Sequence, residues 1–203
     1  KKQVLRIQDY LILQIIKDLF DKKPIYFAAT VSDLNQIGLQ NYLSMEGMTY
    51  RVNFKDNVKK VNYNKMKQNL MASDLSSIIY THKDYNNSIS EENGVYRYTN
   101  LNDTSIYYSG NIQRLVQNYR IGFIRLAQEE LLRDSPNNKK NAEDLIDLMN
   151  DYFPENRLPV EPGIALLVSD SIFSKTGNIS KQKFIYNKLF KSNIPVETAI
   201  YLL

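Results

Sequence analysis

The feature that most constrains this 203-residue chain is the stretch of residues 23–51, KPIYFAATVSDLNQIGLQNYLSMEGMTYR. Pro24 separates it from the preceding segment, because a residue before proline is disfavoured in the helical region. Residues 25–31 form an apolar run rich in β-branched and aromatic side chains, which predicts a strand buried on both faces. We expect this strand to lie at the centre of a small sheet.

The remainder of the stretch predicts a turn, a short helix and a second strand. Leu39 and Leu43 follow Gly38 and have the spacing of residues on one helical face. Gly47 is suited to end such a helix. Residues 48–54 then alternate well enough to form a second strand.

This stretch resembles the extracytoplasmic C-terminal segment of a large family of multi-pass membrane proteins. That family is related to protein O-mannosyltransferases and was long catalogued as a domain of unknown function. The residues that carry the resemblance are Lys23, 24–28 (PIYFA), 30–32 (TVS), Asn35, 37–39 (IGL), Tyr42, Leu43, 45–47 (MEG), Tyr50 and Arg51. A second block comprises Asn118, Arg120 and 125–127 (RLA), at the opening of helical repeats in the family's tail.

The resemblance implies a non-catalytic role for this chain. In enzymes of the family, the catalytic carboxylate lies in an extracytoplasmic loop of the membrane half, which is not present here. The chain would lie on the extracytoplasmic (periplasmic) face of the inner membrane of a Bacteroidetes-like bacterium. It would dock on its own transmembrane half and present a surface to an acceptor protein or a partner subunit. The residues implied for such interfaces are Tyr42, Tyr50, Arg51, Asn118 and Arg120.

The composition excludes several kinds of site. The chain has no cysteine, which rules out disulfides, thiolate metal sites and cysteine nucleophiles. Its net charge of +4 is mild and does not indicate nucleic acid as a partner. No run approaches the roughly 18 apolar residues that span a bilayer. The start at Lys1, without a methionine, is what we expect of a fragment whose membrane half is missing.

Helical spacing dominates outside residues 23–51. Residues 8–22 predict an amphipathic helix that covers the first strand, and residues 64–72 predict a short one. The polar segment 81–110 predicts a loop. Apolar stripes from residue 111 onward predict four helices in consecutive hairpins, joined by short connections that force neighbouring helices together. Their order is similar to that of tetratricopeptide repeats, although the spacing differs.

No local pattern predicts a catalytic residue, a cofactor or a metal ion. His82 is the only histidine and lies in a polar segment without a neighbouring nucleophile. Adjacent acids such as Glu129 and Glu130 point in different directions on a helix. Asn-x-Ser/Thr sequons at Asn86, Asn102 and Asn178 matter only if the source glycosylates asparagine.

The sequence therefore predicts a mostly helical α+β protein with a small α/β unit (1–55), an irregular connection with a short helix (56–110) and antiparallel, tetratricopeptide-like hairpins (111–203). Arg120 and Arg125 project about 140° apart on an ideal helix and should not form one anion clamp. We expect Arg120 to turn toward the α/β unit and join the two halves. Two alternatives to the membrane-protein domain stay open: a stand-alone repeat-type interaction module, and a small α/β enzyme with its site after strand 25–31, where open α/β sheets bind ligands.

Overall fold

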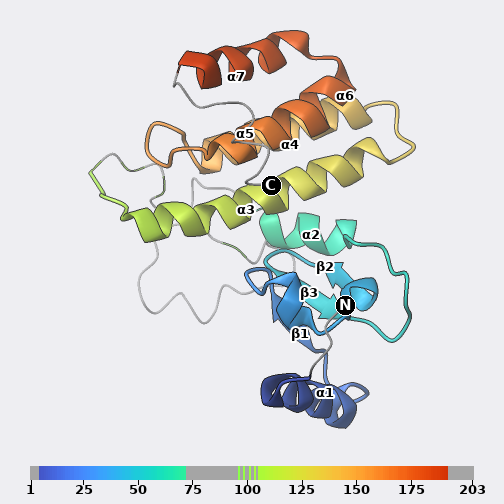
Figure 1. Cartoon of the computed structure of the whole chain (residues 1–203). Helices are drawn as coiled ribbons and strands as arrows, with labels where there is room; N and C mark the ends of the chain where they lie inside the picture. Colours follow the sequence, from blue (N-terminus) through green and yellow to red (C-terminus); the bar gives the residue numbers. More distant parts are fainter. Residues whose placement is uncertain are drawn as a thin grey trace, which may run out of the picture. The chain divides into compact units, whose positions relative to one another are not determined.

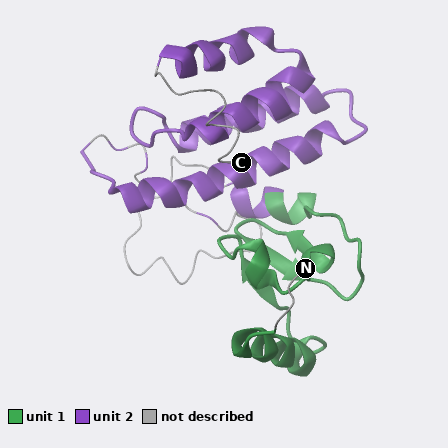
Figure 2. Ribbon diagram, in the orientation of Figure 1, with its two compact units in different colours: residues 1–66 green, residues 67–203 purple. Residues whose placement is uncertain are grey.

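A computed structural model describes residues 5–71, 96, 98, 101, 103 and 105–191, and the chain divides into two compact units (Figure 2). Unit 1 comprises Lys1–Met66 and unit 2 comprises Lys67–Leu203. Most of the expected 81–110 loop lies outside the described residues, as do His82, Asn86 and Asn102. Both units consist of the classes of element that the sequence predicts, and the mostly helical α+β class is confirmed.

Unit 1 opens with helix α1 (Ile7–Leu19), whose first turn is fixed by a buried acid (Figure 1). The Arg6 amide donates a 2.8 Å hydrogen bond to the Asp9 carboxylate, which is fully buried. An acid in this position satisfies a free amide at the helix start and is favoured by the helix dipole. The Arg6 guanidinium also donates to Asn35 Oδ1 at 2.6 Å, so the start of α1 is attached to the 3-10 turn η1 (Asp33–Gln36).

The sheet of unit 1 has three short antiparallel strands in the order β1-β3-β2. They are β1 (Tyr26–Ala28), β2 (Leu43–Met45) and β3 (Thr49–Val52). The expectation of a central, doubly buried strand at residues 25–31 is wrong. β1 is an edge strand in which only Phe27 is buried, because the pleat turns both of its neighbours outward.

The helix expected at Leu39–Leu43 is also wrong, since this segment is the 3-10 turn η2 (Gln40–Tyr42) leading into β2. Ile37 and Gly38 have φ values of 49° and 83°, and two consecutive residues in this region prevent a helix from starting. Leu43 instead pairs with Val52 across the sheet and is buried. Strand pairing therefore overrides the helical spacing of the two leucines.

The core of unit 1 is formed by Phe27, Leu43 and Val52, one from each strand, with Ile12 and Phe20 packed against them. The expectation that the first helix covers β1 is met only in part, since Ile12 and the following Phe20 pack on this core while Leu11, Ile15 and Leu19 stay exposed. Beyond the sheet, Met45 forms an isolated bridge with Val61. Asn62 follows this bridge and accepts a hydrogen bond from the Lys65 amide, at the start of α2 (Tyr63–Leu70).

Unit 2 is a stack of helices that run back and forth (Figure 1). They are α3 (Gly110–Leu131), α4 (Asn138–Tyr152), the helix formed by α5 (Pro162–Val168), the π-helical turn η3 (Ser169–Phe173) and α6 (Ser174–Thr176), and α7 (Ile179–Lys191). α3 packs on α4 and α5, α4 packs on α6, and α5 packs on α7. The expected hairpins are confirmed within a few residues at each end.

Aromatic rings fill the core beside α3. Tyr98 lies within 4.9 Å of the ring centres of both Tyr152 and Phe153, and its hydroxyl donates to the Leu70 carbonyl at 2.9 Å. Burial, and next the neighbouring Tyr119, raise the pKa of Tyr98 well above its usual range. Tyrosine here supplies an apolar body with a satisfied polar end, as is usual in protein interiors.

We predict that Phe27→Ala lowers the free energy of unfolding of unit 1 by about 3–5 kcal/mol, because it empties the centre of a small core. Tyr26→Ala, on the exposed side of the same strand, is the matched control and should cost under about 1 kcal/mol. Urea unfolding followed by circular dichroism measures both. Equal losses for the two variants would show that Phe27 is not the centre of this core.

Candidate functional site

Unit 2 contains a cleft of about 440 Å³ between α4, α5 and α7. Its walls are mainly apolar and include Ile146 and Met149 of α4, Val168 of α5 and Ile185 of α7. Cavities of this size and character are typical of binding sites for small molecules or for inserted side chains of a partner. Phe184 lines the cleft and remains largely exposed.

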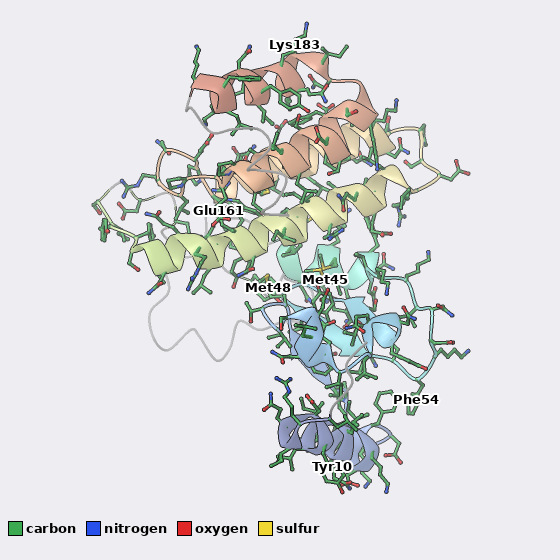
Figure 3. The ribbon with its side chains drawn as sticks, in the orientation of Figure 1. Tyr10, Met45, Met48, Phe54, Glu161 and Lys183 are labelled. Atoms are coloured by element: carbon green, nitrogen blue, oxygen red, sulfur yellow. The ribbon has the colours of Figure 1, made fainter. Side chains whose placement is uncertain are left out.

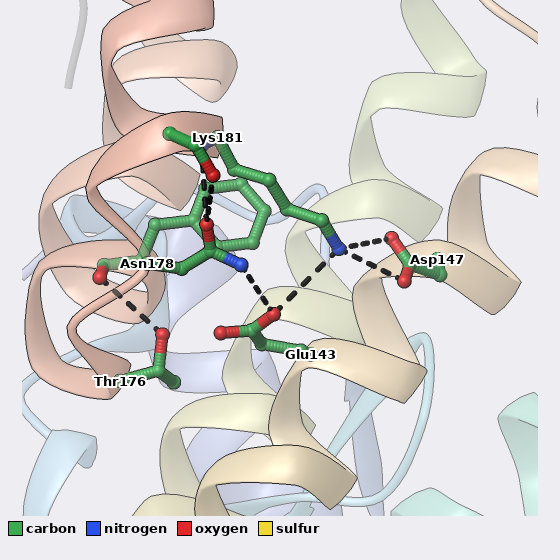
Figure 4. Close-up of polar contacts among 7 residues, drawn as sticks. Glu143, Asp147, Thr176, Asn178 and Lys181 are labelled. Carbon is green, nitrogen blue, oxygen red and sulfur yellow. Dashed lines mark hydrogen bonds and ion pairs between the residues drawn. The ribbon is translucent and has the colours of Figure 1, made fainter.

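Ion pairs between α4 or the segment after it and α7 mark the rim of the cleft. Lys181 Nζ lies 2.9 Å from both carboxylate oxygens of Asp147 and 3.6 Å from Glu143 (Figure 4). Lys188 forms an ion pair with Glu155. Both lysines are therefore neutralised by neighbouring acids, so the rim has no excess of positive charge.

Asn178 connects the start of α7 to α4 (Figure 4). Its side-chain oxygen accepts hydrogen bonds from the Lys181 amide at 3.2 Å and from the Ser180 hydroxyl at 2.9 Å, which caps α7. Its amide nitrogen donates to Glu143 Oε2 at 2.8 Å. The Asn178 side chain therefore has a structural role. It fixes the position of α7, which forms one wall of the cleft.

The pKa of Glu143 reflects this network. Burial alone raises the pKa of its carboxyl group, but hydrogen bonds from Thr176 and Asn178 and the charge of Lys181 outweigh burial and hold the pKa below its usual 4.5. A lowered pKa means that the ionised form stabilises the fold. This contribution is complete above pH 4.5 and is lost as the pH falls through the pKa of the folded state.

We predict that Glu143→Gln lowers the stability of unit 2 at pH 7 by about 1 kcal/mol, and that the difference from the parent disappears as the pH falls below about 4.5. Thermal unfolding at a series of pH values from 7 to 3 measures this. Asp144→Asn, an exposed acid on the same helix, is the control. A difference that is independent of pH would contradict the network as described.

In unit 1, the residues 45–47 (MEG) of the resemblance have structural roles. Glu46 is buried in the turn between β2 and β3, where its carboxylate accepts a 2.9 Å hydrogen bond from the Asn62 side-chain Nδ2. The Gly47 amide donates to Met66 Sδ at 2.7 Å, and Gly47 has a φ of 95°, which favours glycine. The MEG motif therefore ties the sheet to the start of α2.

The residues implied for interfaces are divided between the two units and differ in their burial. Tyr50 is half-buried against the core of unit 1, and Tyr42 is half-buried with its carbonyl bonded to the Asn53 amide. Arg51 is exposed, with Nη1 4.0 Å from the Glu46 carboxylate. Asn118 is half-buried on α3, in unit 2. The interface roles of these residues stay predictions.

Arg120 is fully buried inside unit 2 and makes no described bond to unit 1. Its Nη2 atom donates to the carbonyls of Phe153 and Leu158 at 3.0 and 2.5 Å, at the end of α4. The expectation that Arg120 turns toward the α/β unit is therefore wrong, because its position on α3 faces the α4–α5 connection. Burial lowers the pKa of Arg120 to about 10, which still leaves it charged at pH 7.

We predict that Arg120→Met lowers the stability of unit 2 by about 2–3 kcal/mol, because two buried carbonyls lose their donor. Arg125→Met is the matched control, since Arg125 is exposed on the same helix and bonds only to Gln128 among the described residues. Chemical unfolding of both variants gives the comparison. An Arg120 variant as stable as the Arg125 variant would show that these carbonyls do not depend on the guanidinium.

Comparison with known proteins finds one family. The model of TMEM260-associated domain 2 matches residues 1–70. The match covers unit 1 and the first strong block of the resemblance, whereas Asn118 and Arg120 lie outside it. No curated protein and no solved structure matches the chain. The bacterial source and the tetratricopeptide-like character of the tail stay predictions.

No group of three or more histidine, cysteine or acidic side chains in the described part of the chain could hold a metal ion. None of the described helices is long and apolar enough to cross a bilayer.

Proposed function

We propose that this chain is a non-catalytic domain of a membrane glycosyltransferase-like protein. In this proposal unit 1 docks on the membrane half of the same protein, at its extracytoplasmic (periplasmic) face. The cleft of unit 2 then receives an acceptor protein or a partner subunit. The match to a TMEM260-associated domain supports the kind of parent protein, since TMEM260 is a membrane protein family with a suggested relation to O-mannosyltransferases.

The observation that carries the proposal is a wide apolar face on α1 that unit 1 covers only in part. One side of it presents Ile12, with Phe20 after the helix, to the core of unit 1. The adjoining stripe at i, i+4 spacing is exposed and consists of Ile7, Leu11, Ile15 and Leu19. Ile7 is 84% exposed and Ile15 is 51% exposed. Tyr10, on the same helix, is also largely exposed and is labelled on α1 in Figure 3.

A helix with so wide an apolar face is normally covered over all of it, because each fully exposed aliphatic side chain forfeits about 1.5–3 kcal/mol of burial. The segment that carries the stripe is also the segment that matches the TMEM260-associated family. This coincidence supports the membrane half of the same protein as the occupant. A surface stripe of this kind is a common feature of interaction sites.

We predict that Leu11→Glu with Ile15→Glu releases this domain from the membrane half. The test uses the full-length protein in detergent, with a protease site placed before residue 1. After cleavage the parent domain should co-purify with the membrane half, and the double variant should separate from it, with at least tenfold less retained. Two charges in a buried apolar contact cannot be accommodated.

Leu34→Glu is the control for this experiment, because Leu34 is at least as exposed in unit 1 as the mutated residues but lies on η1, outside the stripe. It should leave retention unchanged. If the double variant is retained as well as the parent, the docking proposal is wrong, whether or not the cleft of unit 2 binds a partner. Circular dichroism of the released domain shows whether the variant remains folded.

The cleft of unit 2 also favours a second candidate function, a stand-alone interaction module. Such a module would bind a partner through the apolar walls between α4, α5 and α7 and would have no membrane half. The same cleavage experiment separates the two candidates. The small-enzyme alternative loses its premise, because the sheet is antiparallel and the rule for open α/β sheets concerns parallel strands.

A further inference from the structure

The cleft between α4, α5 and α7 is not filled by the described side chains around it. Its volume is about 440 Å³, and four of the apolar residues on its walls are only half-buried, namely Val160, Pro162, Ala165 and Ile185. Phe184 also lines the cleft and is 68% exposed. Packed interiors leave few voids larger than a water molecule. An apolar occupant would therefore complete the packing of this part of the stack.

The position of α7 in the stack indicates where such an occupant comes from. Among the described elements, the main packing partners of α7 are η3 and α5. In a stack of helices, the last helix leaves open a face that the next helix would cover. Residues 192–203 (SNIPVETAIYLL) follow α7 directly and lie outside the described residues. Their sequence is the nearest source of an occupant.

The sequence of this segment has the pattern of a short amphipathic helix. Pro195 is suited to the first turn of a helix, and Glu197, two residues later, is favoured there by the helix dipole. The apolar residues recur at i, i+3, i+4 and i+7, and they are Val196, Ala199, Ile200 and Leu203. Residues at this spacing lie on one helical face. The segment therefore offers an apolar surface of the kind that the cleft lacks.

The connection and the length of the segment both suit the cleft. Lys188 and Leu189 line the cleft, and α7 ends just beyond them, at Lys191. Residues 192–194 would form a short connection, which forces consecutive helices to lie antiparallel and side by side. As a helix, residues 195–203 would rise about 13 Å, and residues 181–189, the part of α7 that lines the cleft, rise about 13 Å as well.

We propose that residues 195–203 form a helix that occupies the cleft of unit 2, with its apolar face against the cleft walls. The exposed stripe of α1 plays no part in this contact. The consequence for regulation rests on the proposed function, because an acceptor protein or partner subunit that enters the cleft must first displace these residues. The chain then carries its own competitor for the site.

The first test opens the cleft in the complete 203-residue chain. Ile200→Asp with Leu203→Asp should release the segment, because two charges in an apolar contact cannot be accommodated. A fluorescent peptide of residues 192–203 should then bind the aspartate variant at least tenfold more tightly than the parent chain, whose cleft is occupied. Burial of two aliphatic side chains contributes at least about tenfold to an equilibrium constant. Fluorescence anisotropy measures both affinities.

Thr198→Asp with Tyr201→Asp is the charge-matched control. It adds the same charges to the same segment, but both positions lie off the apolar face of the expected helix. This control should bind the peptide no more than twofold more tightly than the parent chain does. A peptide that itself carries Ile200→Asp and Leu203→Asp should not bind the aspartate variant.

The methionines report where the peptide binds. Met149 lines the cleft, whereas the other four of the five methionines lie at or before residue 71. With isotope-labelled methionine methyl groups, the NMR resonance of Met149 should differ between the parent chain and the aspartate variant. It should return toward its parental position when the peptide binds. The resonances of Met45 and Met48, in unit 1, should not change.

A second measurement keeps the aspartate substitutions out of the chain, in case they prevent folding. The chain has no cysteine, so Thr198→Cys provides a single site for a spin label and leaves the apolar face intact. The label should broaden the Met149 methyl resonance, and reduction of the label should restore it.

Three results would overturn the proposal. The Met149 resonance is not broadened by the label, or the peptide binds the parent chain and the aspartate variant equally well. The third is that a spin-labelled chain broadens Met149 of a separate methyl-labelled chain, which would mean that the segment occupies a second copy. None of these results affects the retention of the domain by the membrane half, so the docking function is tested separately.

Discussion

The buried carboxylate of Asp9 is the constraint on which the arrangement of unit 1 depends. It accepts the amide of Arg6 at the start of α1, while the Arg6 guanidinium reaches Asn35 on η1. These bonds fix the rotation of the helix about its own axis. In this orientation Ile12 and Phe20 pack against the core, and the side chains of Ile7, Leu11, Ile15 and Leu19 stay exposed. The exposed stripe of α1 thus depends on a polar contact at the start of the helix.

In unit 2, polar contacts likewise fix the ends of the helices that line the cleft. Arg120 holds the connection after α4 through the Phe153 and Leu158 carbonyls, and Asn178 holds the start of α7 against Glu143. Both contacts replace water at backbone or side-chain groups that would otherwise be buried without partners. The helices between them can then leave an apolar gap, since their ends are fixed independently of the packing of their middles.

The helical part of the fold could be predicted because its signal is local. Apolar stripes with clear breaks at Pro136, Pro154 and Gly177 gave α3 to α7 within a few residues. The sheet was harder, because β2 has three residues and forms only by pairing with β3. Leu39 and Leu43 have helical spacing. The positive φ angles at Ile37 and Gly38, which prevent a helix, could not be predicted from the neighbouring residues. The hollows could not be predicted from the sequence, because the cleft of unit 2 and the hollow beside residues 20–25 are each lined by segments that are far apart in the chain.

The sequence by itself determined the classes of element, the mostly helical α+β character and the absence of cysteine chemistry, because these follow from composition and short-range periodicity. It also determined which residues resemble the membrane-protein family, though not what they do. The tertiary structure decided that Glu46 and Gly47 serve the β2–β3 turn, that Arg120 serves the α4–α5 connection, and that Lys23 and Arg51 share one hollow. Each of these depends on which distant segments meet, and that is decided by burial and pairing over the whole unit rather than by any local pattern.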